Sequence, residues 1–411
     1  MPTVSNRKGT GSETIYSQFK HLIKKIDNKI YQSKCKPLVS KLFYYLPVKK
    51  NRICCCNFAG KGYGDNPKYI AEEIHLRDSS YQLFWLVNDK SKSEFPEYIH
   101  TVNINSVKAL YIRATSKIWI NNIRNDHPVR KKKSQLYLQT WHAAGLGWKR
   151  VEADAEERLN KGYVAQAKHD GQITDGILAC GKRQEELFKR AFWLNEKAEI
   201  LKYGLPKNDY LVNNVNNTKT YSVLRKKYGL EEHVFYVLYA PTFRDDHSLE
   251  GYKLSFDEII KTLKNKLQKE VKIVVRLHPN VSFQSKFLKY NKSIINGTFF
   301  PDVQELSLAC DCLITDYSSI AADFLLMHKP VFICALDLQE YMEKRGLLPA
   351  YFDSPFPMTQ TNEQLIASIK QFNIKEYIRK ADEWFLKNPL YDDGHAAEKT
   401  VQWIFARVRK K

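Results

Sequence analysis

The sequence predicts an α/β protein built from two doubly wound domains. Short apolar runs typical of buried strands alternate with helical stretches from residue 51 onward. The alternation pauses in the polar, Asn-rich segment 207–219 and then restarts. A chain of 411 residues is also too long for one ordinary domain. Alternating strands and helices form a parallel sheet covered on both faces, and two such units in tandem leave a cleft between them.

The first domain is expected over residues 51–206. The glycine-rich turn at 60–64 follows its first strand, but it lacks both the Gly-x-Gly-x-x-Gly spacing and a Walker Lys-Ser/Thr pair, so it is weak evidence for a phosphate loop. We expect strands at 52–58, 81–87, 117–122, 136–140 and 175–180, and helices at 66–75, 107–115 and 182–192.

A linker is expected over residues 207–219 and the second domain over residues 220–411. Its strands are predicted at 234–240, 271–275, 312–315 and 330–335, and its helices at 255–268, 303–309, 320–327, 337–344, 361–387 and 396–409.

The composition is strongly basic, with 65 Lys and Arg against 45 Asp and Glu and a net charge of +20. Such a charge favours a polyanionic partner: nucleic acid, an anionic membrane or a phosphorylated substrate. Eight cysteines include no Cys-x-x-Cys pair, and three of them are adjacent at 54–56. This usage indicates reduced core thiols. No signal peptide and no transmembrane segment are expected.

Residues 1–50 form a basic segment with eleven Lys and Arg against only Glu13 and Asp27. Apolar residues from Ile15 to Ile30 recur at helical spacing between lysines, and the stretch 38–46 adds further apolar and aromatic residues. The pattern is typical of an amphipathic helix on an anionic membrane surface. The alternative is a helix that packs on the protein's own core and turns its lysines to water.

The stretch 311–323 contains the polar turn Asp-Tyr-Ser-Ser between an expected strand and an expected helix. Ser318 or Ser319 could cap that helix, and its free backbone N–H groups favour an anion. The alternative is a plain helix cap without a ligand.

Two other strands of the second domain also end in polar residues, at Pro241-Thr242 and at Arg276-Leu277-His278. The carboxyl ends of parallel strands share one edge, so these residues are expected to converge on a phosphate group. His142 follows a strand of the first domain and faces the same cleft, which makes it a candidate general base. No Asp-x-Asp pair, His-Glu-x-x-His or Gly-x-Ser-x-Gly motif occurs, so neither a metal ion nor another cofactor is expected.

Together these motifs resemble the CDP-glycerol glycerophosphotransferases, the primases and polymerases of teichoic acid and related capsule polymers. The matching elements follow the family's order, and the most specific of them is Thr-Asp-Tyr-Ser-Ser-x-x-x-Asp. They lie at 60–67, 138–142, 203–209, 239–245, 276–279, 313–323, 345–346 and 393–398.

The resemblance implies a GT-B fold, with two Rossmann-like domains, and transfer of glycerol phosphate from CDP-glycerol with release of CMP. It implies a peripheral enzyme at the cytoplasmic side of the cell membrane, with a polyprenyl-diphosphate-linked saccharide or a growing chain as acceptor. His142 would be the base and His278 a second catalytic residue. The donor would be bound by Lys207, Pro241, Thr242, Arg276, Leu277, His278, Ser318, Ser319 and Asp323.

Two departures from the family pattern concern the polyol and the acceptor. The family motif Trp-His-Gly-Thr-Pro-Leu-Lys is Trp-His-Ala-Ala-Gly-Leu-Gly here, with Lys149 as the nearest replacement for its charge, and Lys207 stands where Arg is more usual. The absence of the extra N-terminal region of the long polymerases favours a primase-type or short-chain transferase. CDP-ribitol as donor and a nucleotide-sugar transferase stay open as alternatives. A nucleic-acid-binding protein is disfavoured, because the aromatic residues follow core patterns rather than alternating with lysines.

Overall fold

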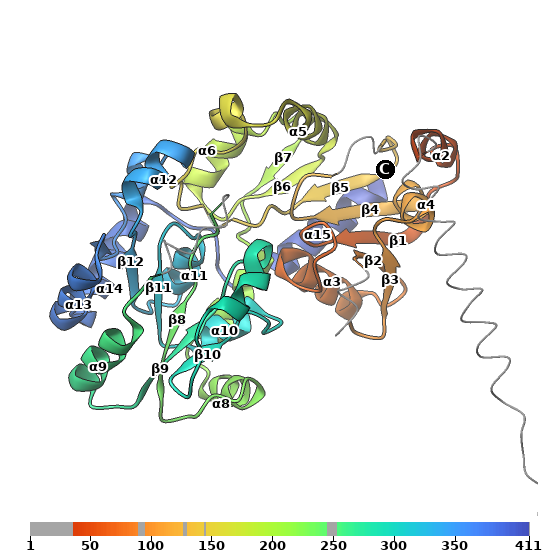
Figure 1. Cartoon of the computed structure of the whole chain (residues 1–411). Coiled ribbons are helices and arrows are strands. Elements are labelled where there is room, and N and C mark those ends of the chain that lie inside the picture. Colours follow the sequence, from red (N-terminus) through yellow and green to blue (C-terminus); the bar gives the residue numbers. More distant parts are fainter. Residues whose placement is uncertain (1–35, 89–94, 126–129, 144, 245–252, 411) are drawn as a thin grey trace, which may run out of the picture.

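The structure, a computed structural model, describes residues 36–88, 95–125, 130–143, 145–244 and 253–410. It consists of two lobes, each built around one parallel sheet with helices on its faces (Figure 1). The predicted α/β class with two Rossmann-like domains in the GT-B arrangement is confirmed. The expected membrane helix at 15–30 lies outside the described residues. In the part of the chain that the structure describes, we find no helix with the length and apolarity of a membrane span.

The sheet of the first lobe has seven parallel strands in the order β3-β2-β1-β4-β5-β6-β7. Both faces are buried, as expected for a parallel sheet: Ile53 and Cys55 pack on one side, and Cys54 and Cys56 pack on the other. The strands are β1 (Lys49–Cys56), β2 (Gln82–Val87), β3 (Ile99–Asn103), β4 (Ser116–Asn121), β5 (Leu136–Gln139), β6 (Gly176–Leu178) and β7 (Glu199–Leu201).

Helices cover both faces of this sheet (Figure 1). They are α2 (Lys36–Phe43), α3 (Asp65–Arg77), α4 (Val107–Thr115), α5 (Lys161–Ile173) and α6 (Lys182–Ala191), with the 3₁₀ segment η2 (Glu152–Arg158). The seven described cysteines are all free and buried, in agreement with the prediction of core thiols.

The sheet of the second lobe has six parallel strands in the order β10-β9-β8-β11-β12-β13. Strands β9, β8 and β11 are therefore neighbours, which brings the ends of all three predicted polar strands together. The strands are β8 (Phe235–Tyr239), β9 (Val271–Val275), β10 (Ile294–Asn296), β11 (Cys312–Thr315), β12 (Val331–Cys334) and β13 (Met358–Thr359).

The helices of this lobe include one predicted element that the structure divides. The expected helix 361–387 is broken at Phe372, because the Asn373 side chain accepts from the backbone N–H groups of Lys375 and Glu376 and starts a new helix. The elements are α8 (Thr218–Lys227), α9 (Phe256–Leu267), η4 (Pro279–Phe287), α10 (Val303–Ala309), α11 (Ile320–Leu326), α12 (Leu338–Arg345), η5 (Pro349–Tyr351), α13 (Asn362–Gln371) and α14 (Ile374–Lys387).

The segment between the sheets, where a linker was expected at 207–219, is largely helical. Helix α7 (Pro206–Asn214) begins with Pro206 in its first turn and buries Leu211 completely. The Asp209 carboxylate accepts from the N–H groups of Ala396 and Ala397 at 2.9 and 2.7 Å, and so caps α15 (Ala396–Lys410). Tertiary contacts thus fix a helix that the local Asn content disfavours.

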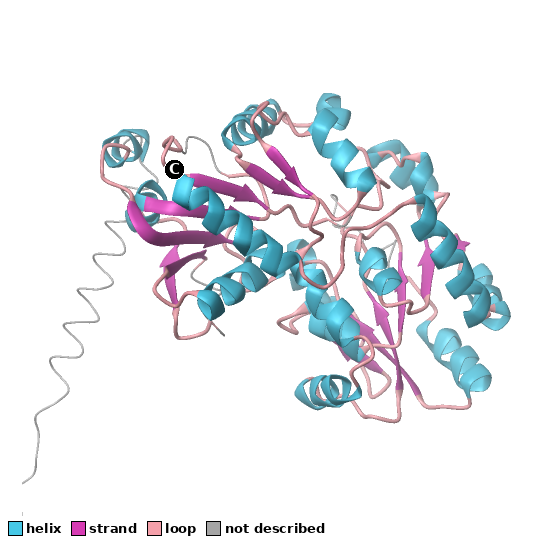
Figure 2. Cartoon of the chain, turned by 180° about the vertical axis from the view of Figure 1, so that it is seen from behind, coloured by secondary structure: helices cyan, strands magenta, loops and turns pink. Residues whose placement is uncertain are grey.

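The last helix also departs from the expected division of the chain. Helix α15 packs against α3 and α7, and its residues Val401, Trp403 and Ile404 belong to the core of the first lobe (Figures 1 and 2). The chain therefore leaves the first lobe through α7 and returns to it through the segment before α15.

Candidate active site between the lobes

A cavity of about 620 Å³ opens between the two lobes, at the carboxyl ends of their strands. Its wall contains most of the predicted site residues: His142, Lys207, Pro241, Arg276, Leu277, His278, Ser318, Ser319 and Asp323. Thr242 lies beside this wall, with its backbone N–H donating to the Asp316 carboxylate at 2.8 Å. The topology of the two sheets has therefore gathered residues that are up to 181 positions apart, from His142 to Asp323.

The wall from the second lobe, which we call the C-terminal wall, comprises Pro241, Arg276, Leu277, His278, Ser318 and Ser319. Asp316 ties two of its turns together, because it accepts from Thr242 N at 2.8 Å and from Arg244 Nη2 at 2.9 Å. Arg244 Nη2 also donates to Asp337 Oδ1 at 2.9 Å. Asp316 thus fixes these two turns of the C-terminal wall relative to each other through hydrogen bonds.

Arg276 supplies a cation to the C-terminal wall. Its Nη1 donates to the carbonyl oxygens of Gly297 and Phe300 at 3.0 and 2.6 Å. Its other guanidinium nitrogens have no acceptor among the described residues. Burial lowers the pKa of Arg276, yet an arginine side chain keeps its charge at neutral pH. The group therefore combines a fixed orientation with donors available to an anion.

The two serines precede α11 at the edge of the cavity. Ser319 is the N-cap residue but makes no side-chain capping bond, and Ser318 Oγ is 3.5 Å from Ile320 N. Of the two residues predicted as possible caps, Ser318 therefore makes a long bond of this kind, and Ser319 makes none. Both hydroxyls and the adjacent backbone N–H groups lie at the cavity, where they can donate to a phosphate oxygen.

The wall from the first lobe, which we call the N-terminal wall, comprises His142 and residues of the segment 57–68. His142 Nδ1 lies 2.8 Å from the Asn122 carbonyl oxygen. A carbonyl only accepts, so Nδ1 carries the proton and Nε2 keeps its lone pair. Burial, aided by the charges of Lys207 and Lys149, lowers the pKa of His142 to about 4. The imidazole is neutral at pH 7 and can accept a proton.

His278 approaches the same cavity from the end of β9. Burial lowers its pKa to about 4, and the charges of Lys61 and Lys149 act in the same direction. The Phe243 ring lies beside it, with ring centroids 4.7 Å apart. His278 is therefore a neutral imidazole on the wall opposite His142.

Lys207 and Asp323 form an ion pair that joins the lobes. Lys207 Nζ lies 3.0 and 2.9 Å from the two carboxylate oxygens, and Gln304 also donates to Asp323 at 2.8 Å. Burial disfavours the Lys207 ammonium, but the charges of Asp323 and Asp65 outweigh burial and raise its pKa. Lys207 and Asp323, both predicted as binding residues, thus line the cavity and form an ion pair with each other.

The segment 57–68 brings residues that the sequence did not single out. Lys61, Asp65 and Lys68 line the cavity, and Lys68 bridges to Asp302 of the second lobe at 2.6 Å. The glycine-rich turn was the available signal, but its spacing matches no known phosphate loop. Its contribution comes from its position opposite the C-terminal wall.

The chain after His142 enters the second lobe. Trp148 is only 4% exposed and packs in the core of that lobe, with its ring centroid 5.1 Å from that of Tyr351. Lys149 lies 5.6 Å from the Tyr341 ring and is not among the lining residues of this cavity. Burial lowers the pKa of Lys149 to about 8.

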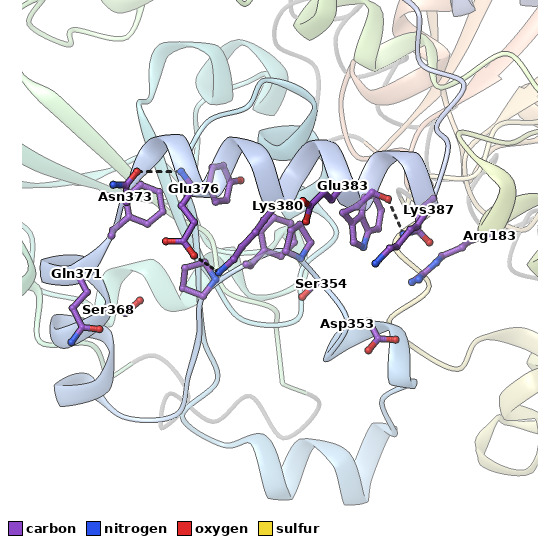
Figure 3. A pocket seen from close by; sticks show the side chains of 17 residues that line it. Arg183, Asp353, Ser354, Ser368, Gln371, Asn373, Glu376, Lys380, Glu383 and Lys387 are labelled. Carbon is purple, nitrogen blue, oxygen red and sulfur yellow. Dashed lines mark hydrogen bonds and ion pairs between the residues drawn. The ribbon is translucent and has the colours of Figure 1, made fainter.

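A second cavity, of about 850 Å³, lies along α14 and the segment 353–357 (Figure 3). Two of its charged side chains, Glu376 and Lys380, form an ion pair at 2.8 Å. None of the predicted site residues lines it. Within the described ranges, no group of three or more His, Cys, Asp or Glu side chains gathers as metal ligands would.

A family model described as CDP-glycerol:poly(glycerophosphate) glycerophosphotransferase matches residues 38–406. The chain belongs to this family. Most of the described chain, both lobes and the cavity between them lie within the match. The cavity described above is therefore the candidate active site of a glycerophosphotransferase-family fold.

Similar proteins include teichoic acid enzymes of two lengths. The teichoic acid poly(glycerol phosphate) polymerase of Bacillus subtilis is 30% identical over 402 residues, covering 93% of this chain but only 52% of the polymerase. This glycerophosphotransferase-family chain thus spans about half the length of that relative. The teichoic acid glycerol-phosphate transferase of Staphylococcus aureus is 29% identical, covering 94% of this chain and 99% of the transferase. The solved structure of the wall teichoic acid polymerase TagF matches with a TM-score of 0.80 at 27% identity, over 96% of this chain and 98% of that one.

Proposed function

We propose that this protein transfers glycerol phosphate from CDP-glycerol to a polyprenyl-diphosphate-linked saccharide or a growing polymer in teichoic acid synthesis, and releases CMP. One observation carries the proposal. A neutral His142, with its Nε2 lone pair available, stands across a single cavity from Arg276 and the serine hydroxyls. This arrangement joins a proton acceptor to an anion-binding wall, which is what phosphoryl transfer to a hydroxyl requires.

In the proposed reaction, His142 Nε2 takes the proton of the acceptor hydroxyl. The oxygen attacks the β-phosphorus of CDP-glycerol and forms a new P–O bond. The bond from that phosphorus to the bridging oxygen breaks, and CMP leaves with the bridging oxygen and its electron pair. Arg276, His278, Ser318 and Ser319 stabilise the charge on the phosphates. The bound phosphates would also raise the pKa of His142, which makes it a better base in the complex than in the free enzyme.

The remaining predicted donor residues support this site in different ways. Pro241 and Leu277 shape the C-terminal wall, and Thr242 holds its turn through Asp316. Lys207 and Asp323 join the two walls next to the phosphates. No metal ion or other cofactor enters the proposed mechanism.

We place the protein at the cytoplasmic side of the cell membrane as a peripheral enzyme. Helix α2 supports this, because Leu38 and Leu42 are 59% and 62% exposed and Tyr45, just beyond it, is 79% exposed. Lys41, Lys49 and Lys50 are exposed beside them. Apolar side chains among lysines suit an anionic lipid surface.

The experiment is CMP release from CDP-glycerol with a lipid-linked disaccharide acceptor, for the wild type and for His142→Gln. We expect the variant to lose about 10²–10⁴-fold in turnover, the usual effect of removing a general base. Its affinity for CDP-glycerol should be kept, because the C-terminal wall is unchanged.

Equal turnover of the two proteins would remove His142 from the role of base. Turnover of CDP-ribitol in preference to CDP-glycerol would reassign the donor. Release of UDP or CDP from a nucleotide sugar would replace the proposal by a glycosyltransferase.

A further inference from the structure

Asp65 places a carboxylate in a cavity otherwise suited to phosphates. We propose that this carboxylate binds hydroxyl groups of the polyol at the reaction centre, on the donor or at the end of the acceptor. The inference rests on the proposed function. It assigns to the N-terminal wall a polyol-binding residue in addition to the base.

The backbone holds Asp65 between two predicted site residues. Asp65 begins α3 in the left-handed region, with φ 55°, and its Oδ1 accepts from Asn66 N at 2.7 Å. The next side chain, Asn66, donates to the carbonyl of Trp141 at 3.1 Å and accepts from Lys207 N at 3.2 Å. Asp65 is thereby fixed beside the turn that carries His142 and the helix that carries Lys207, and all three line the cavity.

The other carboxylates of the cavity wall are engaged by cations. Asp302 pairs with Lys68 at 2.6 Å, Glu305 with Lys227 at 2.5 Å, and Asp323 with Lys207 at 2.9 Å. Asp65 has no Lys, Arg or His nitrogen of the described chain within ion-pair distance. Its pKa is raised to about 6 by burial, although the charge of Lys207 and hydrogen bonds from Asn66 and Asn122 oppose this.

An ionised carboxylate accepts hydrogen bonds and donates none. It repels phosphate oxygens, so among the groups of the proposed substrates its ligand is an uncharged group with donors. Near His142, which acts on the reacting hydroxyl, that group is a polyol carrying free hydroxyls. The ribose hydroxyls of the nucleotide have the same chemistry, and they are the alternative that the experiment must separate.

The test compares ligands with and without the polyol, using Asp65→Asn in the full chain. Asn tolerates the left-handed backbone and keeps an oxygen for Asn66 N, so the turn is preserved. Calorimetry would measure the affinities for CDP-glycerol and CDP, and steady-state kinetics the KM of the acceptor. Asp65→Gly, which suits a positive φ best, is a second variant.

We expect a loss of about tenfold, the usual difference between hydrogen bonds to charged and to neutral acceptors. A loss confined to CDP-glycerol assigns Asp65 to the polyol of the donor. A loss confined to the KM of the acceptor assigns it to the polyol of the acceptor. In both cases the affinity for CDP should stay the same or improve, because a negative charge near the phosphates has been removed.

Equal losses for CDP and CDP-glycerol would overturn the inference, since Asp65 would then act on the nucleotide or on the fold. Unchanged affinities and an unchanged KM would overturn it as well. Glu73→Gln makes the same chemical change on the same helix, where Glu73 pairs with Arg77, and should alter none of these values. CMP release by the wild type is measured alongside, so that failure of the proposed function is seen separately.

Discussion

The two walls of the cavity are built by different means. The residues of the C-terminal wall follow directly on three adjacent parallel strands, so the topology of the sheet alone brings them together. The N-terminal wall depends on turns with unusual backbone conformations. Four non-glycine residues there have positive φ values: Phe58 (41°), Ala59 (54°), Asp65 (55°) and Trp141 (52°).

Left-handed conformations at such residues are costly and persist only where the surrounding structure enforces them. The C-terminal wall offers a general phosphate-binding edge, whereas the N-terminal wall fixes individual side chains next to the reacting atoms. The C-terminal wall can therefore be recognised from the topology of the sheet. The N-terminal wall, which carries His142 and Asp65, can be recognised only once its turns are folded.

The largest effect is expected at the ion pair between the walls. Lys207→Met leaves Asp323, which is 3% exposed, without its cation. Breaking a buried pair in this way costs about 3–5 kcal/mol. We expect the apparent free energy of unfolding in urea to fall by that amount.

Two controls make this prediction specific. Lys68→Met breaks another ion pair between the lobes, but Asp302 keeps its bonds from Tyr69 and from the start of α10, so the loss should be smaller. The double variant Lys207→Met/Asp323→Leu should recover part of the loss. If Lys207→Met were as stable as the wild type, the packing of the two walls would not depend on this ion pair.

The sequence predicted the larger part of the fold, because long apolar runs and helical spacing are local signals. Strand β9 (Val271–Val275) and helices α4 and α10 have the predicted bounds. Several strands that sequence analysis missed are short, such as β13 with two residues and β10 with three. Strand β3 has five residues but was also missed, because only two of them are buried. Helix α7 was missed because its stability comes from contacts with α15 and α3, which no local pattern encodes.

The candidate site divides in the same way. Arg276, His278 and the serines could be named because each follows an apolar strand in the sequence. Asp65 lies in the family-matching element 60–67, but a single Asp in a glycine-rich turn has no spacing that assigns it a role. The engagement of Lys207 with Asp323 was also out of reach, because it joins residues 116 positions apart.

The second prediction separates the walls by donor binding. Arg276→Gln removes the cation of the C-terminal wall, and we expect the affinity for CDP-glycerol to fall about 100-fold, near the upper range for a charged hydrogen bond. Arg276→Lys should recover part of it, without the forked geometry. The control is His142→Gln, whose affinity for CDP-glycerol, measured by calorimetry, should lie within about twofold of that of the wild type. Equal losses in both variants would contradict the division between binding and proton transfer.

The third prediction concerns the pH dependence of kcat/KM. Both cavity histidines have pKa values lowered to about 4 by burial, so they stay neutral as the pH falls from 7.5 to 5. The pKa of Asp65 is raised to about 6 by burial, so its carboxylate is lost in this range. We expect kcat/KM of the wild type to decrease by up to about tenfold towards pH 5, in keeping with the loss of a charged acceptor.

Asp65→Asn gives the control for this profile. Its kcat/KM should stay level over the same range, so that the two profiles converge near pH 5. A decrease in both proteins with a midpoint near pH 6.5 would mean that a histidine with an ordinary pKa controls the rate.

The smallest effect is expected on the outer surface of the first lobe. Leu42 of α2 is 62% exposed, and partial insertion of one leucine into a lipid surface contributes about 1 kcal/mol, or roughly fivefold in partitioning. Leu42→Ser should weaken binding to phosphatidylglycerol vesicles by that factor, measured by sedimentation. Leu76→Ser, at a leucine that is 81% exposed on α3, should leave partitioning unchanged. The CMP release of both variants with a water-soluble acceptor should match the wild type, because neither leucine lines the cavity. Equal partitioning of the wild type and both variants would show that α2 does not contact the membrane. Lipid-linked acceptors would then approach the N-terminal wall from another surface of the protein.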